Sequence, residues 1–501
     1  SKPLWVFLLA LMFRAGLFDP VATPKLLSMA AAVASFVLLR RISGKIFGNR
    51  DSTLHFIPAL LLACSVPFTA WSISGLENGL YIFLILFAID LRLSEIEEAA
   101  RAPASGVVLF LAAITRPEGA LYFAAALVHG IAAALLSRRV TRRDLLWLAV
   151  FAVPFLTYHA WHYMYFADLL PNTYYAKMEA GGPSQHLREQ LLDIHSYGWE
   201  YLLAGLRDQN LRWLLPAATL IMLVSIIRRR SAGAPLLLLF VLVSAFLPVF
   251  VGGDWMLQYR FLTPLLALSY LVVAGALLLA VEALTAPGRG STLHAARVAA
   301  AGILVAGTAG MALLPAAALL DGPVKPPSVS FARRAERGRR FAALAKELHV
   351  QDASLMDPDL GGNAYASGLR MIDLGGLADA HIARHDFNRR YFGRYIFDEQ
   401  RPTFIHTHCI WSLRSQIHQY LDLRRDYLPL WESPCSSSCC PGTLDGEYLR
   451  KEILVDLSPR IEQPLDVAFE GGPTLVGYHL EPRIVPPGGV VHLTTWWTAT
   501  S

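Results

Sequence analysis

Residues 112–123 read AAITRPEGALYF, so that Arg116, Pro117 and Glu118 separate two apolar runs that would otherwise be continuous. A charge at the centre of a bilayer costs about 3 kcal/mol or more, whereas a charge at the boundary with water costs little. Pro117 and the following Gly119 are also residue types that end helices and form turns. We therefore predict a helical hairpin whose turn lies at a membrane surface.

The rest of the chain agrees with a membrane fold. Of its 501 residues, 54% are hydrophobic and only 17% are charged, which is too apolar for a soluble domain of ordinary size. Apolar runs that could cross a hydrocarbon core of about 30 Å as helices occur at 21–39, 54–73, 79–91, 104–115, 119–136, 145–166, 211–227, 234–251, 261–281 and 295–319. Two of them, 79–91 and 104–115, are short. We predict a polytopic α-helical membrane domain of about ten spans over residues 1–320.

The sequence changes character at the Pro-rich stretch DGPVKPPSVS, residues 321–330. We expect residues 321–460 to form an extracytoplasmic α/β domain. Residues 461–501 are expected to begin a β-sandwich, because alternating strand patterns flank a Pro-Gly turn there. The net charge of +5 is small and spread over many loops, so nucleic-acid binding is not indicated.

Basic loops predict the orientation of the membrane domain. Cations gather in every second connection, at Arg40, Arg41, Lys45, Arg50, Arg138, Arg139, Arg142, Arg143, Arg228, Arg229, Arg230, Arg289 and Arg297. The positive-inside rule places these connections in the cytoplasm. The loops 74–79, 115–119, 167–210 and 252–260 then face outward with the C-terminal region, and the unusual polar clusters are expected at this outer face alone.

The outward loops supply the candidate binding residues. A guanidinium or an ammonium group neutralises a phosphate, and the candidates for this role are Arg116, Lys177 and Arg260. Aromatic rings stack on sugars and carboxylates can act as bases; the candidates for a sugar or lipid headgroup are Glu77, Asp168, Asn172, Tyr175 and Trp255. The pattern favours an amphiphile with an apolar tail, a phosphate and a sugar. Taken singly, each loop is also typical of a solvated ion pair or an interfacial aromatic belt.

Five stretches occur in order along the chain: GLENGLYIFLILFAI, AAITRPEGALYF, ADLLPNTYYAKM, GGDWMLQYRFLTPLLAL and MIDLGGLADAHIAR. Together they resemble the bacterial polytopic glycosyltransferases of the GT-C superfamily, nearest to the terminal arabinofuranosyltransferases, over roughly residues 1–385. The resemblance implies inverting transfer of a sugar from a polyprenyl-phosphate donor to a hydroxyl of a cell-envelope glycan or lipid, at the outer face of the bacterial plasma membrane. It implies no nucleotide sugar and no cofactor, and it leaves a divalent metal open.

The resemblance also implies a departure at the N-terminus. Relatives carry a first span and an acidic outer loop, the source of the presumed catalytic aspartate, before a stretch that resembles SKPLWVFLLALMF at residues 1–13. We therefore expect a chain truncated at both ends, with the catalytic aspartate upstream of Ser1 and no activity in the fragment itself. Glu118 and Asp254 are the remaining candidates for a catalytic carboxylate, and we favour substrate-binding or structural roles for both.

Metal ligation is not indicated by residue spacing. His159 and His162 lie three residues apart but lack an accompanying Cys or carboxylate pattern. The remaining histidines and acids of the C-terminal region have no fixed metal-ligand spacing and are expected to be surface or turn groups; they are His381, His385, Asp386, His406 and His408.

The cysteines agree with the predicted topology. Cys64 lies within an apolar run and is expected to be a small apolar filler. Disulfides persist outside the cytoplasm, where the other four are expected: Cys409, Cys435, Cys439 and Cys440. One bridge to Cys409 and one local bridge are conceivable, adjacent cysteines are not expected to pair, and a zinc site is the weaker alternative.

Two other functions remain open at this point. A transporter or flippase for a lipid-linked sugar would share the amphiphile-binding surface, but it predicts polar or broken positions in matched halves at mid-membrane, and the sequence shows no such repeat. A non-catalytic membrane scaffold would display the C-terminal region and would not require cations and acids to converge on one face.

Overall fold

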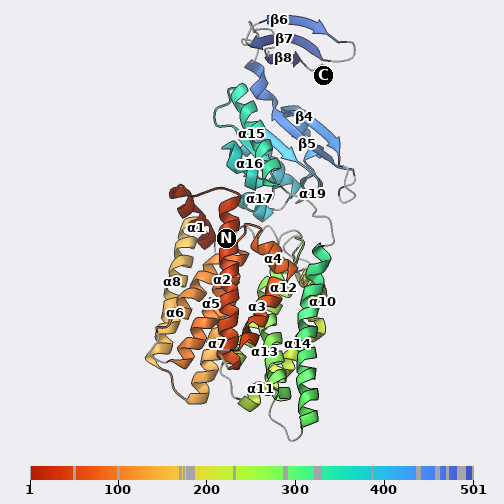
Figure 1. Ribbon diagram of the computed structural model, residues 1–501. Coiled ribbons are helices and arrows are strands. Elements are labelled where there is room, and N and C mark those ends of the chain that lie inside the picture. The colour runs from red at the N-terminus through yellow and green to blue at the C-terminus, as the bar shows by residue number, and fades with distance from the viewer. Residues whose placement is uncertain are drawn as a thin grey trace. The chain divides into compact units, whose positions relative to one another are not determined.

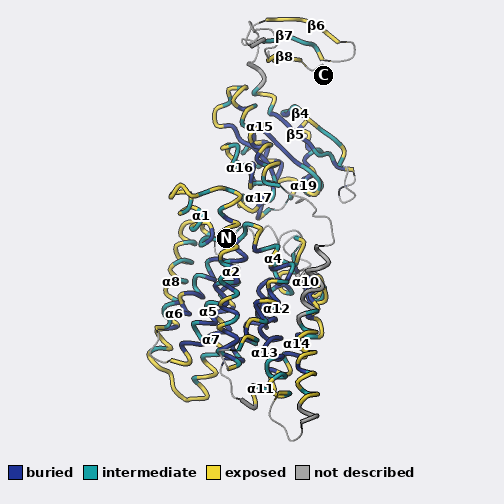
Figure 2. The backbone as a smooth tube through the Cα atoms, viewed as in Figure 1, coloured by how far each residue is buried: buried dark blue, intermediate teal, exposed yellow. Residues whose placement is uncertain are grey.

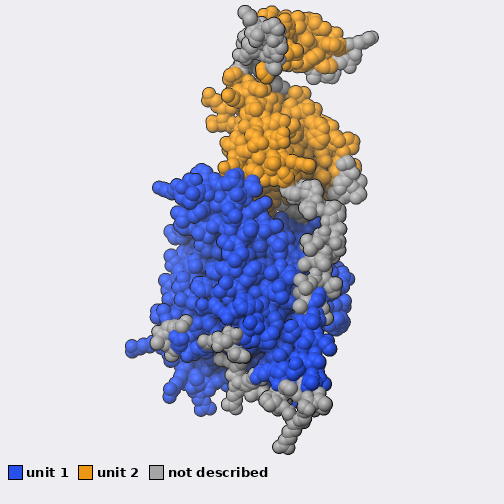
Figure 3. All heavy atoms as spheres, in the orientation of Figure 1, with its two compact units in different colours: residues 1–171, 181–326 blue, residues 172–180, 327–501 orange. Residues whose placement is uncertain are grey.

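The computed structural model describes residues 2–498 apart from short gaps at 49–51, 99–101, 169–171, 173–174, 176–186, 230–232, 255, 286–290, 321–329, 386, 436–439, 441, 457–462, 470–472 and 482–491. The chain divides into two compact units (Figure 3). Unit 1 comprises Ser1–Pro171 and Gly181–Pro326, and unit 2 comprises Asn172–Ala180 and Pro327–Ser501. The sequence places the change of domain at 320, a few residues before Pro326, and does not anticipate that Asn172–Ala180 belongs with unit 2.

Unit 1 is helical (Figure 1). Its described helices are α1 (Pro3–Arg14), α2 (Ala22–Phe47), η1 (Thr53–Phe56), α3 (Ile57–Ala63), α4 (Val66–Ser72), α5 (Asn78–Glu97), α6 (Ala104–Thr115), α7 (Gly119–Ser137), α8 (Arg142–Phe166), α10 (Leu187–Asp208), α11 (Leu211–Arg229), α12 (Gly233–Phe250), η2 (Arg260–Leu262), α13 (Thr263–Thr285) and α14 (Ser291–Leu320). Several of these helices are long and apolar, as expected of a multi-pass membrane protein.

The described helices that could cross a membrane are fewer than the apolar runs of the sequence. Among the described residues, five helices are long and apolar enough to cross a membrane, or up to seven if each of two sharply bent helix pairs counts as one span. The pairs are Thr53–Ala63 with Val66–Ser72, bent by 72°, and Tyr197–Asp208 with Leu211–Ile227, bent by 88°. Helix α6 has 12 residues and therefore rises only about 18 Å. Hydropathy alone does not show such bends and short helices, which is why the sequence suggests ten spans.

Helix α13 forms the centre of unit 1. Every residue from Thr263 to Leu277 is buried, and 78% of its apolar span lies inside the protein. It packs against α2, α3, α11, α12 and α14. A helix that is apolar on all sides is stable when it is buried in a protein core or in a membrane. Figure 2 shows the buried positions concentrated within the helical bundle.

Unit 2 contains a five-stranded mixed sheet of order β2-β1-β3-β5-β4. Its strands are β1 (Ser354–Asp357), β2 (Arg370–Asp373), β3 (Phe404–Thr407), β4 (Tyr427–Pro434) and β5 (Leu444–Arg450). Strands β2, β1 and β3 are parallel, whereas β5 pairs antiparallel with β3 and β4. The accompanying helices are α15 (Phe331–Glu347), α16 (Leu360–Ser367), α17 (Ala380–His385), α18 (Arg389–Gly393), η3 (Arg394–Gln400), α19 (Ile410–Ser415), η4 (Ile417–Gln419), α20 (Leu421–Asp426) and η5 (Lys451–Asp456).

The two faces of this sheet bury different cores. Leu355 and Phe404 pack with Phe341 of α15 on one face. Their neighbours Met356 and Ile405 belong to the core on the other face. Because side chains alternate along a strand, strands that are buried on both faces read as continuous apolar runs.

The end of the chain forms a second, antiparallel sheet of order β6-β7-β8. Its strands are β6 (Gln463–Ala468), β7 (Thr474–Glu481) and β8 (His492–Thr498). The observed order of an apolar helical unit, an α/β region and a β-rich end confirms the predicted class of a polytopic helical protein with a mixed C-terminal region.

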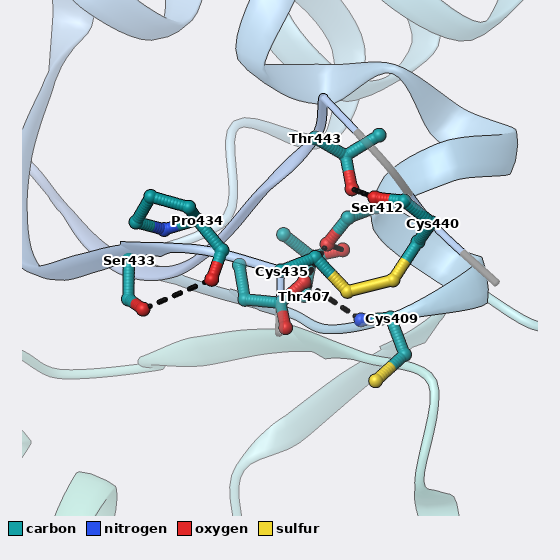
Figure 4. Close-up of a disulfide and its surroundings, with 9 residues drawn as sticks. Thr407, Cys409, Ser412, Ser433, Pro434, Cys435, Cys440 and Thr443 are labelled. Atoms are coloured by element: carbon teal, nitrogen blue, oxygen red, sulfur yellow. Dashed lines mark hydrogen bonds between the residues drawn. A yellow bond between two sulfur atoms is a disulfide. The ribbon is translucent and has the colours of Figure 1, made fainter. Parts of the chain in front are cut away.

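The described cysteines of unit 2 form one local bridge. Cys435 is joined to Cys440 (Figure 4), and Cys64 of unit 1 is a free thiol. The backbone N–H of Cys409 donates to Asp445 Oδ1 at 2.7 Å. The local bridge that the sequence allowed is therefore formed, whereas Cys439 lies outside the described residues.

Candidate functional site

The turn of the opening stretch is a tight hairpin between α6 and α7. Arg116 ends α6 in an extended conformation, and α7 begins at Gly119. A Cβ atom at Gly119 would lie only 2.4 Å from the backbone carbonyl carbon of Ala112. The close approach of the two helices therefore requires glycine at this position, and it fixes Arg116 and Glu118 on either side of Pro117.

Arg116 is buried at this turn among polar and aromatic partners. Its Nε donates to Glu118 Oε1 at 2.5 Å, and its Nη1 lies 3.6 Å from Glu77 Oε1. The guanidinium carbon lies 5.3 Å from the ring centroids of both Tyr81 and Phe261. The side chain is 11% exposed. The pair with Glu118 is thus largely buried, in contrast to a solvated surface ion pair.

Arg260 reaches the same place from the loop that precedes α13. Its Nε lies 2.8 Å from Asp254 Oδ2, and the Asp254 side chain is almost fully buried. The guanidinium carbon lies 5.0 Å from the Phe261 ring centroid and 5.5 Å from that of Trp71. The loops 115–119 and 252–260 therefore meet at one end of unit 1.

Lys2 is the third cation of this group. Its Nζ donates to Glu77 Oε2 at 2.7 Å, and the Glu77 side chain is 1% exposed. We refer to these seven residues as the arginine cluster: Lys2, Glu77, Arg116, Glu118, Asp254, Arg260 and Phe261. It contains three cations and three carboxylates, so its ionised groups balance.

The opposite charges of the cluster keep one another ionised. Burial raises the pKa of Glu77, but the charges of Arg116 and Lys2 outweigh burial and hold that pKa below its ordinary value. Burial lowers the pKa of Arg116, but Glu118 and Glu77 outweigh burial, so its pKa is raised. Burial lowers the pKa of Lys2. Glu77 and Arg116 are consequently ionised at neutral pH.

The structure brings together five of the residues singled out in the sequence: Glu77, Arg116, Glu118, Asp254 and Arg260. It adds Lys2 and Phe261, which the sequence analysis did not select. Lys2 lies in a stretch noted only for its position at the start of the chain. Phe261 follows a selected arginine, but an isolated phenylalanine at the start of an apolar run carries no signal of its own.

The structure shows no contact of the remaining candidates with the arginine cluster among the described residues. Asp168 follows the end of α8, where its backbone carbonyl oxygen lies 3.0 Å from His162 Nδ1. Asn172 and Tyr175 belong to unit 2, and the Arg384 guanidinium carbon lies 5.5 Å from the Tyr175 ring centroid. Lys177 and Trp255 lie outside the described residues.

A second polar cluster lies toward the other end of α5, about 20–27 Å from Glu77 along the helix. Asp90 is buried and paired with Lys45 at 2.6 Å and Arg41 at 2.9 Å. Glu95 accepts hydrogen bonds from Ser105. The expectation that unusual polar clusters occur at one end alone is therefore wrong, because an acid within one apolar helix can be stabilised by cations of a neighbouring helix, here α2.

A cavity of about 410 Å³ opens near this second cluster. Its lining includes Lys45, Leu93, Met222 and Gly233. Lys45 and Leu93 lie toward the C-terminal ends of α2 and α5, whereas the arginine cluster lies at the N-terminal end of α5. The cavity is therefore not part of the arginine cluster, and we assign it no role in the site.

Histidines of unit 2 also differ from expectation. His406 is 5% exposed, and His408 Nε2 lies 3.0 Å from Asp359 Oδ2. His406 is therefore not the surface or turn group that its spacing suggested, because residues separated along the chain meet at one edge of the sheet.

One protein family matches part of unit 2. Residues 332–443, within unit 2, match a family described as "Domain of unknown function (DUF8728)". No curated protein matches the sequence significantly.

Two solved structures of an oligosaccharyltransferase from Archaeoglobus fulgidus are similar in fold. One, in complex with Zn and sulfate, has a TM-score of 0.51 at 12% identity and covers 86% of this chain and 63% of its own. The other, tethered to an acceptor peptide that contains the NVT sequon, has a TM-score of 0.51 at 13% identity and covers 89% of this chain and 65% of its own.

The chain therefore has a GT-C-like fold. It spans somewhat under two thirds of the length of these structures. The predicted GT-C-like fold is confirmed, whereas a relation to terminal arabinofuranosyltransferases is suggested by the sequence motifs alone.

Proposed function

We propose that this chain is the membrane part of a glycosyltransferase that binds a polyprenyl-phosphate-linked sugar at the arginine cluster and transfers the sugar to an acceptor hydroxyl. The observation that carries the proposal is the convergence of Arg116 and Arg260 on the ring of Phe261. The GT-C-like fold supports it, because structural neighbours with this fold are oligosaccharyltransferases.

Two planar guanidinium groups held over one ring suit a phosphate. The aromatic face restricts their orientation, so that less side-chain entropy is lost when they bind an anion. Arginine also offers paired N–H donors to phosphate oxygens. Lys2 adds a third cation, more exposed than the arginines at 35% of its side chain.

The three carboxylates differ in how easily a phosphate can displace them from the cations of the arginine cluster. Asp254 and Glu77 are 1% exposed and hold Arg260, Arg116 and Lys2 in place. Glu118 is the most exposed of the three carboxylates, at 22%. A phosphate can therefore compete with Glu118 for Arg116 more easily than with the other two. This favours positioning roles for Glu77 and Asp254.

The proposed setting follows from the fold and the loop charges. We place the arginine cluster at the outer face of a bacterial plasma membrane, with residues 321–460 and 461–501 as extracytoplasmic domains. The acceptor is then a cell-envelope glycan or lipid. The sequence motifs and the alternation of basic connections support this arrangement.

The proposal can be tested by binding of a polyprenyl phosphate to the purified chain in nanodiscs, measured by native mass spectrometry. R116K and R260K keep the positive charge but remove the planar fork, so we expect at least tenfold weaker binding. R92K is the matched control, because Arg92 is similarly buried and paired with Glu95 at the other end of α5. No binding by the unmodified chain, or equal weakening by all three variants, would overturn the proposal.

A further inference from the structure

The sheet of unit 2 brings three strand ends together. Strands β2, β1 and β3 are parallel, so their carboxyl ends lie at one edge. The chain passes from β1 to β2 on one side and then to β3 on the other side of β1. Such a reversal of strand order leaves a crevice at the carboxyl ends of the two strands, and this is where open α/β sheets bind ligands.

Potential metal ligands occupy this edge. Asp357 ends β1 and is followed by Asp359, while His406 lies in β3 and His408 follows that strand. One ligand atom each from Asp359, His406 and His408 lies within 4.8 Å of the others. In tetrahedral coordination with bonds of about 2.0–2.1 Å, donor atoms lie about 3.3 Å apart. The cluster thus reaches this geometry by small side-chain movements.

His406 provides an independent indication of a ligand. It is 5% exposed, yet neither ring nitrogen makes a hydrogen bond among the residues that the structure describes. Its Nδ1 lies 3.3 Å from Glu447 Oε1, and Glu447 stands directly opposite His406 in the β3–β5 ladder. Metal-bound histidines commonly direct their second ring nitrogen to a carboxylate in this way. Arg340 holds Glu447 through both carboxylate oxygens, at 2.5 and 2.6 Å.

His408 and Asp359 already form the other half of such a site. His408 Nε2 and Asp359 Oδ2 lie 3.0 Å apart and share a hydrogen bond. An ion between them would take the place of the shared proton. Arg334 and Arg337 also contact Asp359 Oδ2, at 2.7 and 3.3 Å. A carboxylate has about four lone-pair positions, so Asp359 can keep a guanidinium partner and still bind a metal.

We propose that Asp359, His406 and His408 bind a divalent transition-metal ion, with Zn²⁺ as the best match. Two imidazoles and one carboxylate are a known ligand set for zinc, and three protein ligands leave a fourth position for water. The side chains of Asp359 and His408 are 19% and 26% exposed, which gives the ion a path from solvent. This site lies within unit 2 and does not depend on the function proposed for the arginine cluster.

The full chain, purified without a polyhistidine tag and stripped with a chelator, should be titrated with Zn²⁺ alone by isothermal calorimetry. We expect one equivalent to bind. H406Q, H408Q and D359N should each weaken binding at least 100-fold, and E447Q, which removes only the supporting carboxylate, should weaken it about 10–100-fold. Replacement by Co²⁺ should give a visible absorption band of tetrahedral coordination that disappears in H408Q.

H385Q is the matched control. His385 lies in the same unit, and its Nδ1 pairs with the backbone carbonyl of His381 rather than with the proposed site. Circular dichroism should show that H408Q keeps the fold, because its side chain is the most exposed of the three proposed ligands. Binding that is lost in H406Q and H408Q but kept in H385Q supports the site. No binding, or equal binding by H408Q and the unmodified chain, overturns it.

Discussion

Arg116 and Arg260, which lie in different loops of the membrane unit, place their guanidinium carbons 5.3 and 5.0 Å from the centroid of the same ring, Phe261. Two guanidinium groups on the same ring would repel each other if no acidic groups were nearby. Glu118 and Glu77 offset Arg116, and Asp254 offsets Arg260. The ring and the carboxylates together allow two arginines to be held side by side.

Replacing the shared ring of Phe261 should weaken phosphate binding by Arg116 and by Arg260 at once. A desolvated cation–π contact is worth about 1–2 kcal/mol, so F261L should reduce the affinity for a polyprenyl phosphate about tenfold. Native mass spectrometry of the variant in nanodiscs provides the measurement. F83L is a suitable control, because Phe83 stacks on Phe87 within α5. Equal affinity of F261L and F83L would show that the ring does not orient the arginines for binding.

Removing the charge of Glu118 should have the opposite effect on binding. Glu118 is the most exposed carboxylate partner of the cluster, and it competes with an incoming phosphate for Arg116. E118Q should therefore bind a polyprenyl phosphate several-fold more tightly than the unmodified chain, and the difference should shrink at high salt. Unchanged or weaker binding by E118Q would indicate that the phosphate does not contact Arg116.

The Glu77 carboxylate should stabilise unit 1 in a pH-dependent manner. Its pKa lies below the ordinary value of 4.5, because the charges of Arg116 and Lys2 outweigh burial. Its contribution is therefore complete above pH 4.5 and is lost as the pH falls below that value. E77Q should cost about 2 kcal/mol at pH 7, since Arg116 keeps Glu118 and Lys2 is partly exposed.

Thermal unfolding in detergent measures the loss of stability in E77Q. Labelling of the free Cys64 thiol reports the unfolding. E77Q should lower the Tm by about 2–4 °C at pH 7, and the difference should become smaller at pH 4 and below. E97Q is the control, because Glu97 is exposed at the other end of α5. A difference between E77Q and the unmodified chain that does not change with pH would contradict the ion-pair explanation.

Adding a single methyl group at the hairpin should destabilise unit 1. The Cβ of G119A would lie 2.4 Å from a backbone carbon of Ala112, which cannot move as a side chain can. We expect a loss of about 2–3 kcal/mol in the free energy of unfolding, measured by the same labelling assay.

The matched substitution is G130A in the same helix, α7. Its new Cβ would lie 3.5 Å from the nearest atom, Arg92 Nη2, which belongs to a long side chain. Alanine in a helix interior is favoured over glycine by about 0.5–1 kcal/mol, so G130A should be neutral or stabilising. If both variants unfolded at the same temperature, close packing at Gly119 would not explain the geometry of the turn.

The sequence predicts the helical hairpin at 112–123 because its signals are local. Apolar runs, a proline and a glycine specify where helices end, whatever the rest of the chain does. The same reasoning selects Arg116 and Glu118 as boundary residues. It cannot select Lys2 or Phe261, because their importance depends on loops that are distant in sequence.

Local pattern also fails for His406 and His408. Their spacing within the chain matches no metal-binding motif, yet the parallel pairing of β1 and β3 brings them to Asp359. Asp90 is a comparable case at the other end of the membrane unit, since only helix packing shows that Lys45 and Arg41 neutralise it.

The sequence by itself determines that this is a multi-pass helical protein with a mixed C-terminal region, because burial of apolar surface in lipid depends on composition and period. Tertiary structure alone decides which charges meet: Arg116 with Arg260 over Phe261, and His406 with Asp359 at the sheet edge. The physical reason is that electrostatic and ligand contacts act over a few ångströms, and such distances between remote residues are fixed only when the helices and strands pack.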